Sequence, residues 1–408
     1  MPPKTKAFKL SKYLSLLQDH LASENGEQAA KLFSINGPHF PSLVLEVSSV
    51  NSQDLEQDVY SALDEQWAEI CLMHIKVIAQ CQLNRIIDAA ADQNTLAQTF
   101  HQIFTTQTRW CLPIFYAIAK DLRDLSIQAD LLLSQQGMKV GRVEEAARTL
   151  NRGFSLCITD RSGYEATRKW GTYYITNLLF KTYFQLGSTN LCTNVLRLIA
   201  AAPDLPPLER FPIGHQVTHR FYLGLLSFQN EQYKKADVDL SFAFRRCPRD
   251  SPKNKILILN YLIPTRLLYG ILPSPKLFQR YPSLAALYEG FSNAIQSGDL
   301  ASFDECLSQS EQLLFQKGTF LTIEKCRLLC VRTLFKKVWL LQNKSPKFQL
   351  ALFQTALSFC GQPHDVADVE CLLANMIDKG LVKGYISHER SFVVLSQKDP
   401  FPPLQSFQ

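Results

Sequence analysis

Hydrophobic residues recur every three to four positions over most of this 408-residue chain, which is the spacing of amphipathic α-helices. The pattern runs from Val59 to about Leu198, with breaks near residues 92, 135–141, 160–163 and 187–189. Helices joined by such short breaks pack readily as antiparallel pairs. We therefore expect a row of helix pairs in the first half of the chain.

The N-terminal segment is less regular. Residues 7–35 predict one or two amphipathic helices. Pro38 and Pro41 then interrupt the helical pattern, and residues 50–58 are polar. We expect this polar stretch to be an approach to the next helix rather than a helix itself.

A proline-rich stretch, residues 201–214, predicts a linker between the two halves of the chain. The residues after it are spaced like a tetratricopeptide repeat, in which small side chains let two helices approach closely. The matching positions are Leu223, Gly224, Tyr233, Ala236, Leu240, Ala243 and Pro248. A weaker match to the same spacing over residues 179–196 indicates that similar helix pairs precede this repeat. Stacking such pairs buries their apolar faces, which predicts a solenoid.

Three further helices are expected before the C-terminal region. Gly298 is placed to end one helix, and Asp299 or Ser302 to begin the next. Residues 322–342 then predict one long helix. Its expected buried side comprises Leu328, Leu334, Phe335, Val338 and Leu341.

Near the C-terminus the helical spacing gives way to a helix followed by two strands. Asp365 can cap the helix, with Asp368 three residues on, and Gly380 is placed to end it. The expected apolar face comprises Val369, Leu372, Leu373, Met376 and Ile377. A strand is expected over Val382, Tyr385 and Ile386, then a turn over 387–391 and a second strand over 392–395. With an earlier helix expected over 348–359, beginning after Pro346, this order is typical of a winged helix.

These patterns together predict a mainly α protein, in which a right-handed helical-repeat (TPR/HEAT-like) solenoid ends in a C-terminal winged helix. We expect N-terminal helical repeats over residues 1–208 and further repeats over 209–345. The winged helix is expected over 346–396 and a C-terminal tail over 397–408. Winged helices dock on nucleic acid or on other winged helices.

Net charge is +6, but it is placed unevenly. Residues 1–208 carry a net charge of −1 and residues 209–408 a net charge of +7. Residues 312–347 alone hold eight basic side chains and a single acidic one, Glu324. A one-sided basic patch is typical of a protein that binds a polyanion. A solvated face balanced by an acidic protein partner explains the same pattern.

The eleven cysteines form no Cys-x-x-Cys pair, so a zinc ribbon is not supported. We expect buried free thiols in a reducing compartment. The N-terminus lacks an apolar signal core, and the longest apolar run, 256–263, is too short to span a bilayer. We therefore expect a cytosolic or nuclear protein that is not attached to a membrane.

Motifs for catalysis and cofactor binding are not found in the sequence. It contains no Walker-type, dinucleotide-binding or nucleophile-elbow motif. His215 and His219 are four residues apart, like half of a metal site, but no third ligand can be identified, so we expect structural histidines. We predict no catalytic residue, no cofactor, no metal and no small-molecule substrate.

The architecture and several segments resemble a known family. A helical solenoid that ends in a winged helix is the arrangement of PCI domains, and residues 372–386 resemble the PCI signature. The resemblance places a PCI domain over residues 209–396. More specific segments are similar to the PCI-domain-containing protein two family, called Thp-one in yeast. They are residues 169–171, 179–184, 240–244, 253–255, 334–338, 382–388 and 400–404.

The resemblance implies a subunit of the second transcription-and-export (TREX) complex, located in the nucleus and at the nuclear pore, with some in the cytoplasm. Its implied partners are a GANP/Sac-type scaffold PCI protein, the small acidic Dss/Sem protein, and RNA or DNA bound with weak sequence specificity. A sister family, resembling signalosome subunit twelve, shares many of these motifs and works with a different scaffold. The density of matches favours the export family.

Three basic groups are candidate sites. On the long helix, phosphate contacts are expected from Lys325, Arg332, Lys336 and Lys337. On the winged helix, the candidates for nucleic acid are Lys379, Lys383 and Arg390. A further run, Arg245, Arg246, Arg249, Lys253 and Lys255, is a candidate for an acidic partner such as the Dss/Sem protein, or for nucleic acid. Each group has a plain alternative: a solvated face for the long helix and the run, and partner packing for the winged helix.

Our first hypothesis is a non-catalytic scaffold subunit whose repeats bind proteins and whose basic winged-helix end binds nucleic acid. On this hypothesis, charge reversal at Lys325, Arg332 and Lys336 weakens RNA binding without unfolding the protein. The second is a purely structural PCI subunit of a lid-like, signalosome-like or splicing-linked complex without nucleic-acid contact. The third, an enzyme, would need a concentrated set of matched titratable groups.

Overall fold

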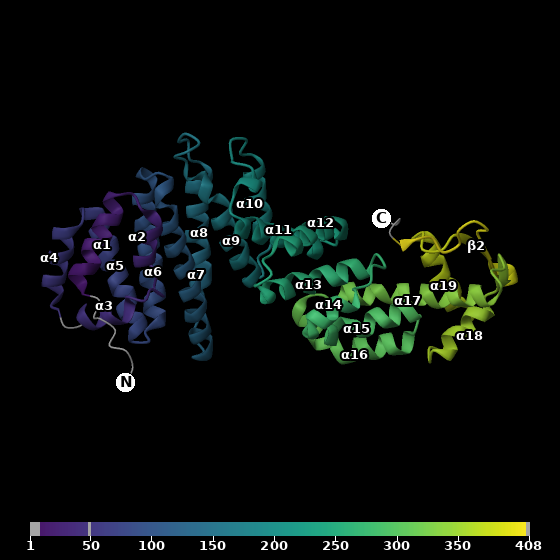
Figure 1. The fold of residues 1–408 in the computed structure, drawn as a ribbon. Coiled ribbons are helices and arrows are strands. Elements are labelled where there is room, and N and C mark those ends of the chain that lie inside the picture. The colour runs from purple at the N-terminus through teal and green to yellow at the C-terminus, as the bar shows by residue number, and fades with distance from the viewer. Residues whose placement is uncertain (1–8, 48–49, 405–408) are drawn as a thin grey trace. The chain divides into compact units, whose positions relative to one another are not determined.

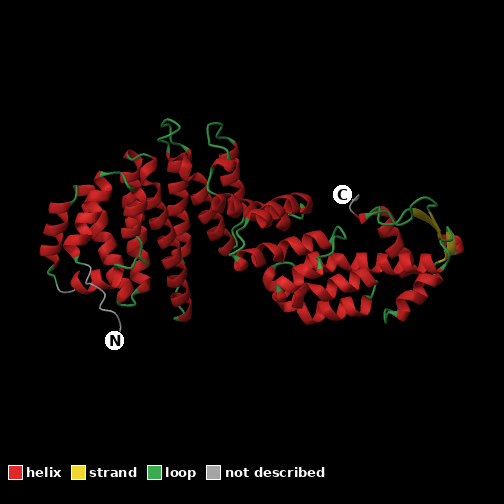
Figure 2. Ribbon diagram, viewed as in Figure 1, coloured by secondary structure: helices red, strands yellow, loops and turns green. Residues whose placement is uncertain are grey.

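The computed structural model describes residues 9–47 and 50–404, and helices dominate them (Figures 1 and 2). They form two compact units, residues 1–222 and 223–408. The mainly α architecture with a small C-terminal sheet confirms the predicted fold class. The domain boundaries expected from the sequence stay a prediction. Among the described residues, no helix is both long and apolar enough to cross a membrane.

Unit 1 is built from helices that pack against their neighbours in the chain, such as α5 on α6 and α7 on α8. Three short 3₁₀ turns lie between helices: η1 (Arg109–Cys111), η2 (Arg168–Gly171) and η3 (Leu208–Arg210). The α-helices are α1 (Leu10–Ala22), α2 (Gly26–Leu32), α3 (Phe40–Val47), α4 (Ser52–Ala62), α5 (Glu65–Gln82), α6 (Ile86–Thr106), α7 (Leu112–Gln135), α8 (Arg142–Ile158), α9 (Thr172–Gln185) and α10 (Asn190–Ala200).

Two expectations for unit 1 are wrong. The break expected near Asp92 lies instead at residues 83–85, where Asn84 takes a left-handed φ of 57° and α6 then runs unbroken. Pro41 lies within α3 instead of interrupting the helical pattern, and most of the polar stretch, residues 52–58, is helical as part of α4. Pro41 is compatible with α3 since it lies in the first turn, where its missing N–H has no partner to lose. The other breaks in the pattern are confirmed.

Unit 2 continues with helices and ends in a three-stranded sheet. The helix α11 (Ile213–Gln229) contains the unit boundary. The elements after it are α12 (Tyr233–Arg246), α13 (Pro252–Leu267), α14 (Pro275–Arg280), α15 (Pro282–Ser297), α16 (Leu300–Lys317), α17 (Phe320–Leu341), β1 (Lys347–Gln349), α18 (Ala351–Phe359), α19 (Val366–Asp378), β2 (Gly384–Ser387), η4 (His388–Arg390) and β3 (Phe392–Leu395).

The predicted repeat is a close helix crossing. A Cβ atom at Gly224 on α11 would lie 2.7 Å from Cγ of Leu240 on α12, so only glycine lets the helices approach this far. Ala236 and Ala243 are fully buried on the same helix. At the next expected boundary, Gly298 takes a left-handed φ of 69° and the Asp299 carboxylate accepts a hydrogen bond from the Ser302 N–H. The α11–α12 crossing and the turn between α15 and α16 therefore both follow from local sequence.

The winged helix is formed as expected, with one correction. Asp365 and Asp368 form a capping box at the start of α19, and Gly380 has a φ of 70° after it. The sheet has the order β1-β3-β2, with both pairs antiparallel. We expected residues 348–359 to be one helix, but residues 347–349 form β1 and only α18 is helical. Phe348 is buried in this strand because its ring packs against Phe353.

Candidate nucleic-acid interface

Helix α17 was expected to present a basic face and a buried face. The buried face is formed largely as predicted, since Phe335 and Val338 are buried, and Phe335 stacks on Phe353 with ring centroids 4.1 Å apart. Leu328 and Leu334 are half-buried, and Leu341, the last residue of α17, has 80% of its surface exposed.

Lys325 is exposed but not free. Its Nζ lies 2.6 Å from the Glu231 carboxylate and 5.7 Å from the ring centroid of Tyr233. Burial alone would lower the pKa of Lys325, but the bond to Glu231 raises it above its ordinary value. The ammonium group is therefore charged and already partly balanced, so a phosphate would have to compete with a carboxylate.

Arg332 lies on the expected face but is 6% exposed, so it is covered in this structure, and its role in binding phosphate stays a prediction. Its Nε donates to the Leu381 carbonyl oxygen at 2.8 Å, and Nη2 donates to the Pro402 carbonyl oxygen. Its guanidinium carbon also lies 5.7 Å from the ring centroid of Phe401. Burial lowers the pKa of Arg332, and the nearby Asp399 opposes this. Arg332 thus joins α17 to two other parts of the chain.

Residues 399–404, which we call the C-terminal strap, cover Arg332. Phe401 is buried and packs on Trp339 of α17, with ring centroids 5.7 Å apart. The Pro400 carbonyl oxygen accepts a hydrogen bond from the Lys383 N–H at 2.9 Å. The sequence marked Pro400–Leu404 as a family segment, but nothing in its local pattern reveals that it folds back onto α17.

The two remaining lysines of α17 are exposed. Lys337 donates to the carbonyl oxygen of Ser297, the last residue of α15, where a cation also interacts favourably with the helix dipole. Lys336 lies beside the C-terminal strap and lines a cleft of about 580 Å³. The cleft is lined by Tyr269, Gly270, Arg332, Lys336, Asp399, Phe401, Pro402, Pro403 and Leu404.

The winged helix carries its basic residues outside α19. Lys379 follows the last turn of α19, Lys383 precedes β2, and Arg390 lies in the turn between β2 and β3. All three are exposed. Lys383 also joins the C-terminal strap through its backbone N–H, and its carbonyl oxygen accepts from the Ser396 N–H at 2.8 Å. These side chains are the most accessible cations of the predicted interface.

Helix α19 itself is acidic, which the search for basic clusters did not reveal. Residues 365–378 contain Asp365, Asp368, Glu370 and Asp378, and neither lysine nor arginine. Glu370 also binds the ring of His388 in the wing, with an oxygen 2.9 Å from Nδ1. Carboxylates repel phosphates, so α19 is unsuited to entering a nucleic-acid groove. The composition of this segment alone could have indicated this.

The basic run that begins at the end of α12 contains exposed cations and one buried cation, as α17 does. Arg245, Arg246, Arg249 and Lys253 are exposed. Lys255 is 7% exposed, and its Nζ donates to the Phe244 carbonyl oxygen at 2.9 Å while lying 4.6 Å from the Phe244 ring centroid. Lys255 therefore binds the C-terminal end of α12, which corrects its predicted role in contacting a partner.

The histidine pair on α11 is part of the aromatic core of unit 1. His219 is 4% exposed, and its ring packs edge-on against Tyr173 and parallel to Phe180. Burial, together with nearby Arg220, lowers its pKa to about 3, so the ring is neutral near pH 7. His215 packs against the rings of Tyr116 and Tyr174. Packing explains both histidines, and no cluster of metal-ligating side chains is found among the described residues.

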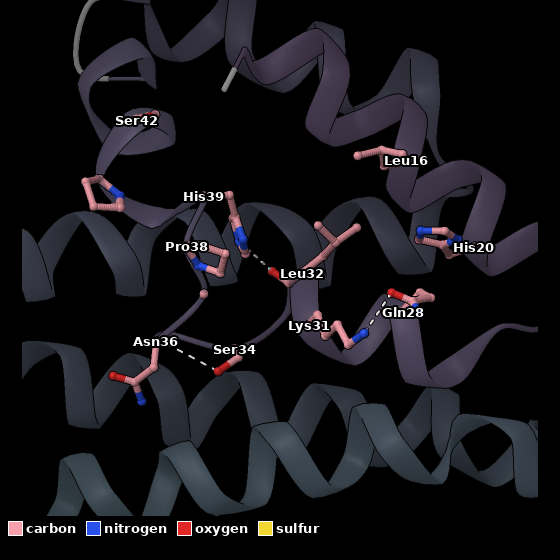
Figure 3. Close-up of a pocket in the computed structure, with 12 residues that line it drawn as sticks. Leu16, His20, Gln28, Lys31, Leu32, Ser34, Asn36, Pro38, His39 and Ser42 are labelled. Carbon is pink, nitrogen blue, oxygen red and sulfur yellow. Dashed lines mark hydrogen bonds between the residues drawn. The ribbon is translucent and has the colours of Figure 1, made fainter. Parts of the chain in front are cut away.

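A pocket of about 660 Å³ lies in unit 1, at the N-terminal helices α1 to α3 (Figure 3). Several of its polar side chains bind one another or the backbone. The Nζ of Lys31 donates to Gln28 at 3.1 Å, and the His39 ring bonds the Leu32 carbonyl oxygen at 3.2 Å. None of the candidate basic residues lines this pocket, so it does not contribute to the interface.

The comparisons with known proteins cover nearly the whole chain. Residues 300–397 match the PCI domain. The chain is 38% identical to Protein CSN12 homolog of Schizosaccharomyces pombe, over 96% of this chain and 97% of that protein. It is 34% identical to PCI domain-containing protein 2 of Xenopus laevis, over 97% and 98%. It is 30% identical to Enhanced ethylene response protein 5 of Arabidopsis thaliana, over 97% and 96%.

Proposed function

The chain belongs to the PCI-domain family whose members include proteins named CSN12 homolog and PCI domain-containing protein 2, and from this membership we propose that it is a scaffold subunit of a nuclear mRNA-export complex. The observation that carries the proposal is the likeness to PCI domain-containing protein 2. It extends over the helical repeats as well as the winged helix, including the first hundred residues, for which the sequence offered no motif.

In this proposal the helical repeats bind proteins. The partners are a GANP/Sac-type PCI scaffold and the small acidic Dss/Sem protein. The exposed arginines at and after the C-terminal end of α12, namely Arg245, Arg246 and Arg249, suit an acidic partner because they have no ion-pair partner among the described residues. The complex acts in the nucleus and at the nuclear pore, with some of the protein in the cytoplasm.

RNA or DNA is bound, in this proposal, by the turn and wing of the winged helix rather than by α19. Lys379, Lys383 and Arg390 are exposed, whereas α19 carries only acidic charge. Contacts from lysine and arginine to phosphates carry no sequence information. Binding through them has weak sequence preference and falls as salt rises. Lys336 and Lys337 extend this surface onto α17.

The test is affinity purification of the tagged chain from nuclear extract, with mass spectrometry of the bound proteins and a parallel RNA titration across salt. Recovery of a Sac-type scaffold and the small acidic subunit, with salt-dependent RNA binding, is the expected result. Recovery of signalosome, lid or splicing-linked subunits, without RNA affinity, would contradict the export function.

A second candidate is a purely structural PCI subunit without nucleic-acid contact. Two observations favour it. The acidic charge of α19 disfavours docking in a groove, and Arg332 and Lys255 are committed to internal carbonyl groups. The relatives named CSN12 homolog are compatible with such a role. The RNA titration separates the two candidates, because only the export function requires binding that weakens with salt.

A further inference from the structure

Arg332 presents an electrostatic problem that its neighbours do not solve. Its side chain is nine-tenths buried, yet its two hydrogen-bond acceptors are neutral carbonyl oxygens, those of Leu381 and Pro402. No carboxylate of the described residues forms an ion pair with it. A buried cation without a counter-ion is costly. The position is therefore one at which an anion would be stabilised.

The cleft beside Arg332 brings a second cation next to it, under the C-terminal strap. It measures about 580 Å³, and Lys336 lies on its wall together with Arg332. Asp399 of the C-terminal strap also lines it and is its one carboxylate among the described residues. When the strap lies in place, Asp399 and the Pro402 carbonyl group are the negative ends facing these two cations. Without the strap, the two cations would face an incoming anion together.

The C-terminal strap is held by interactions that can be broken without disturbing a helix. Phe401 packs on Trp339, the Pro400 carbonyl oxygen accepts from the Lys383 N–H, and Leu404 lies against Gly270. The guanidinium group of Arg332 carries a full positive charge, so an anionic oxygen attracts it more strongly than the partial negative charge of a carbonyl oxygen does. A phosphate oxygen is thus a better partner for Nη2 of Arg332 than the Pro402 carbonyl oxygen is.

We propose that the C-terminal strap occupies a phosphate position on α17, and that an RNA backbone binds Arg332 and Lys336 by displacing it. The strap is then a self-occluding segment that weakens RNA binding until it lifts. This inference rests on the proposed RNA-binding function and adds a regulated contact to it. It also explains why the central cation of the predicted basic face is covered.

A reversible crosslink tests the proposal in the full chain. A Cβ atom built on Gly270 lies 3.2 Å from Cβ of Leu404, close to the separation that a disulfide spans. The double variant Gly270→Cys, Leu404→Cys should therefore oxidise and lock the strap. The left-handed φ of Gly270, +68°, strains the new cysteine equally in the oxidised and reduced forms, so the two forms of one protein can be compared.

The readout is the affinity for a single-stranded RNA oligonucleotide as a function of salt. The oxidised form is expected to bind more weakly than the reduced form, with a salt slope shallower by about 0.7 for each phosphate that the protein no longer neutralises. The single variant Gly270→Cys, treated in parallel, controls for oxidation of native thiols such as the exposed Cys371. Inorganic phosphate, tested as a competitor, distinguishes a site for a free anion from one that needs an RNA backbone.

A second variant should change the RNA affinity in the opposite direction. Phe401→Ala removes the apolar anchor of the strap and is expected to tighten RNA binding by about threefold to tenfold, since opening becomes less costly. A purely structural strap would leave the affinity unchanged or lower it. Equal RNA affinity and slope in the oxidised and reduced forms would overturn the occlusion alone. If the pair does not oxidise, an RNA affinity of Phe401→Ala that is unchanged or lower overturns it instead. Absence of RNA binding in every form would refute the RNA-binding function and the occlusion with it.

Discussion

Arg332 on α17 and Lys383 beside β2 contact the same C-terminal strap, but the strap buries one and leaves the other exposed. The guanidinium group of Arg332 donates hydrogen bonds to the carbonyl oxygens of Leu381 and Pro402. Lys383 contributes only backbone groups and keeps its ammonium group in solvent. The difference shows that a basic side chain next to the strap stays accessible to a partner where the backbone, and not the side chain, makes the structural contacts.

The same division separates residues after α12. Lys255 binds the end of its own preceding helix, while Arg245 and Arg246 stay exposed in the last turn of α12. In both regions the buried cation stabilises the fold and the exposed ones remain available to partners. Substitution of a buried cation should therefore lower stability, and substitution of an exposed cation should affect binding. The expected changes in stability decrease from Arg332 to the wing.

Charge reversal at Arg332 should have the largest effect. In Arg332→Glu a buried carboxylate would face two carbonyl oxygens, and the free energy of unfolding should fall by about 4 kcal/mol. This replaces our expectation from the sequence that the reversal leaves the fold intact. Chemical denaturation measures it, with Lys336→Glu as the matched exposed control on the same helix. The control should change stability by less than about 0.5 kcal/mol, and similar losses in both variants would contradict the assignment of Arg332 as buried.

The capping box of α19 should contribute a moderate amount. Asp365→Ala removes the side chain that accepts from the Asp368 N–H at 2.7 Å, and should lower the free energy of unfolding by about 1 kcal/mol. Thermal or denaturant unfolding measures this. Asp378→Ala, at the other end of the helix, should not destabilise it, because a carboxylate is unfavourable near a helix C-terminus. Equal losses in the two variants would argue against the cap.

The ion pair of Lys325 should contribute little, since both partners are substantially exposed. Lys325→Gln should lower the free energy of unfolding by at most about 1 kcal/mol, and less at high salt. Glu231→Gln is the matched variant on the other side of the pair. A decrease that is larger than this, or that does not depend on salt, would place Lys325 with Arg332 among the structural cations.

The smallest effect is expected at the wing. The hydrogen bond to Glu370 raises the pKa of His388 above its ordinary 6.5. The stability that this His388–Glu370 pair contributes is therefore fully present below pH 6.5. It is lost as pH rises through the raised value. NMR titration of the His388 ring should show the raised pKa in the wild type and an ordinary one in Glu370→Gln. An unchanged value in the variant would exclude this pair as the cause.

Local signals were sufficient to predict much of the fold. Asp365, Gly380, Gly298 and the pair Gly224 with Leu240 all act through neighbours a few residues away or through one helix crossing. The strand β1 was missed because its three residues pair with β3, more than forty residues later. Burial of Arg332 was missed for the same reason, since its partner Pro402 is 70 residues away. Helical spacing predicts which residues share a face, but not which distant segment covers that face.

In the resting protein, the exposed cations of the turn and wing should provide most of the RNA contacts, because Arg332 on α17 is covered. The most direct measurement is the dependence of RNA affinity on salt for the wild type and for the triple variant Lys379→Gln, Lys383→Gln, Arg390→Gln. The matched control is Arg245→Gln, Arg246→Gln, Arg249→Gln, which removes the same charge from the α12 region. We predict a slope shallower by about 2 in the first variant and little changed in the control. Equal slopes in the wild type and the wing variant would contradict this assignment of the RNA contacts.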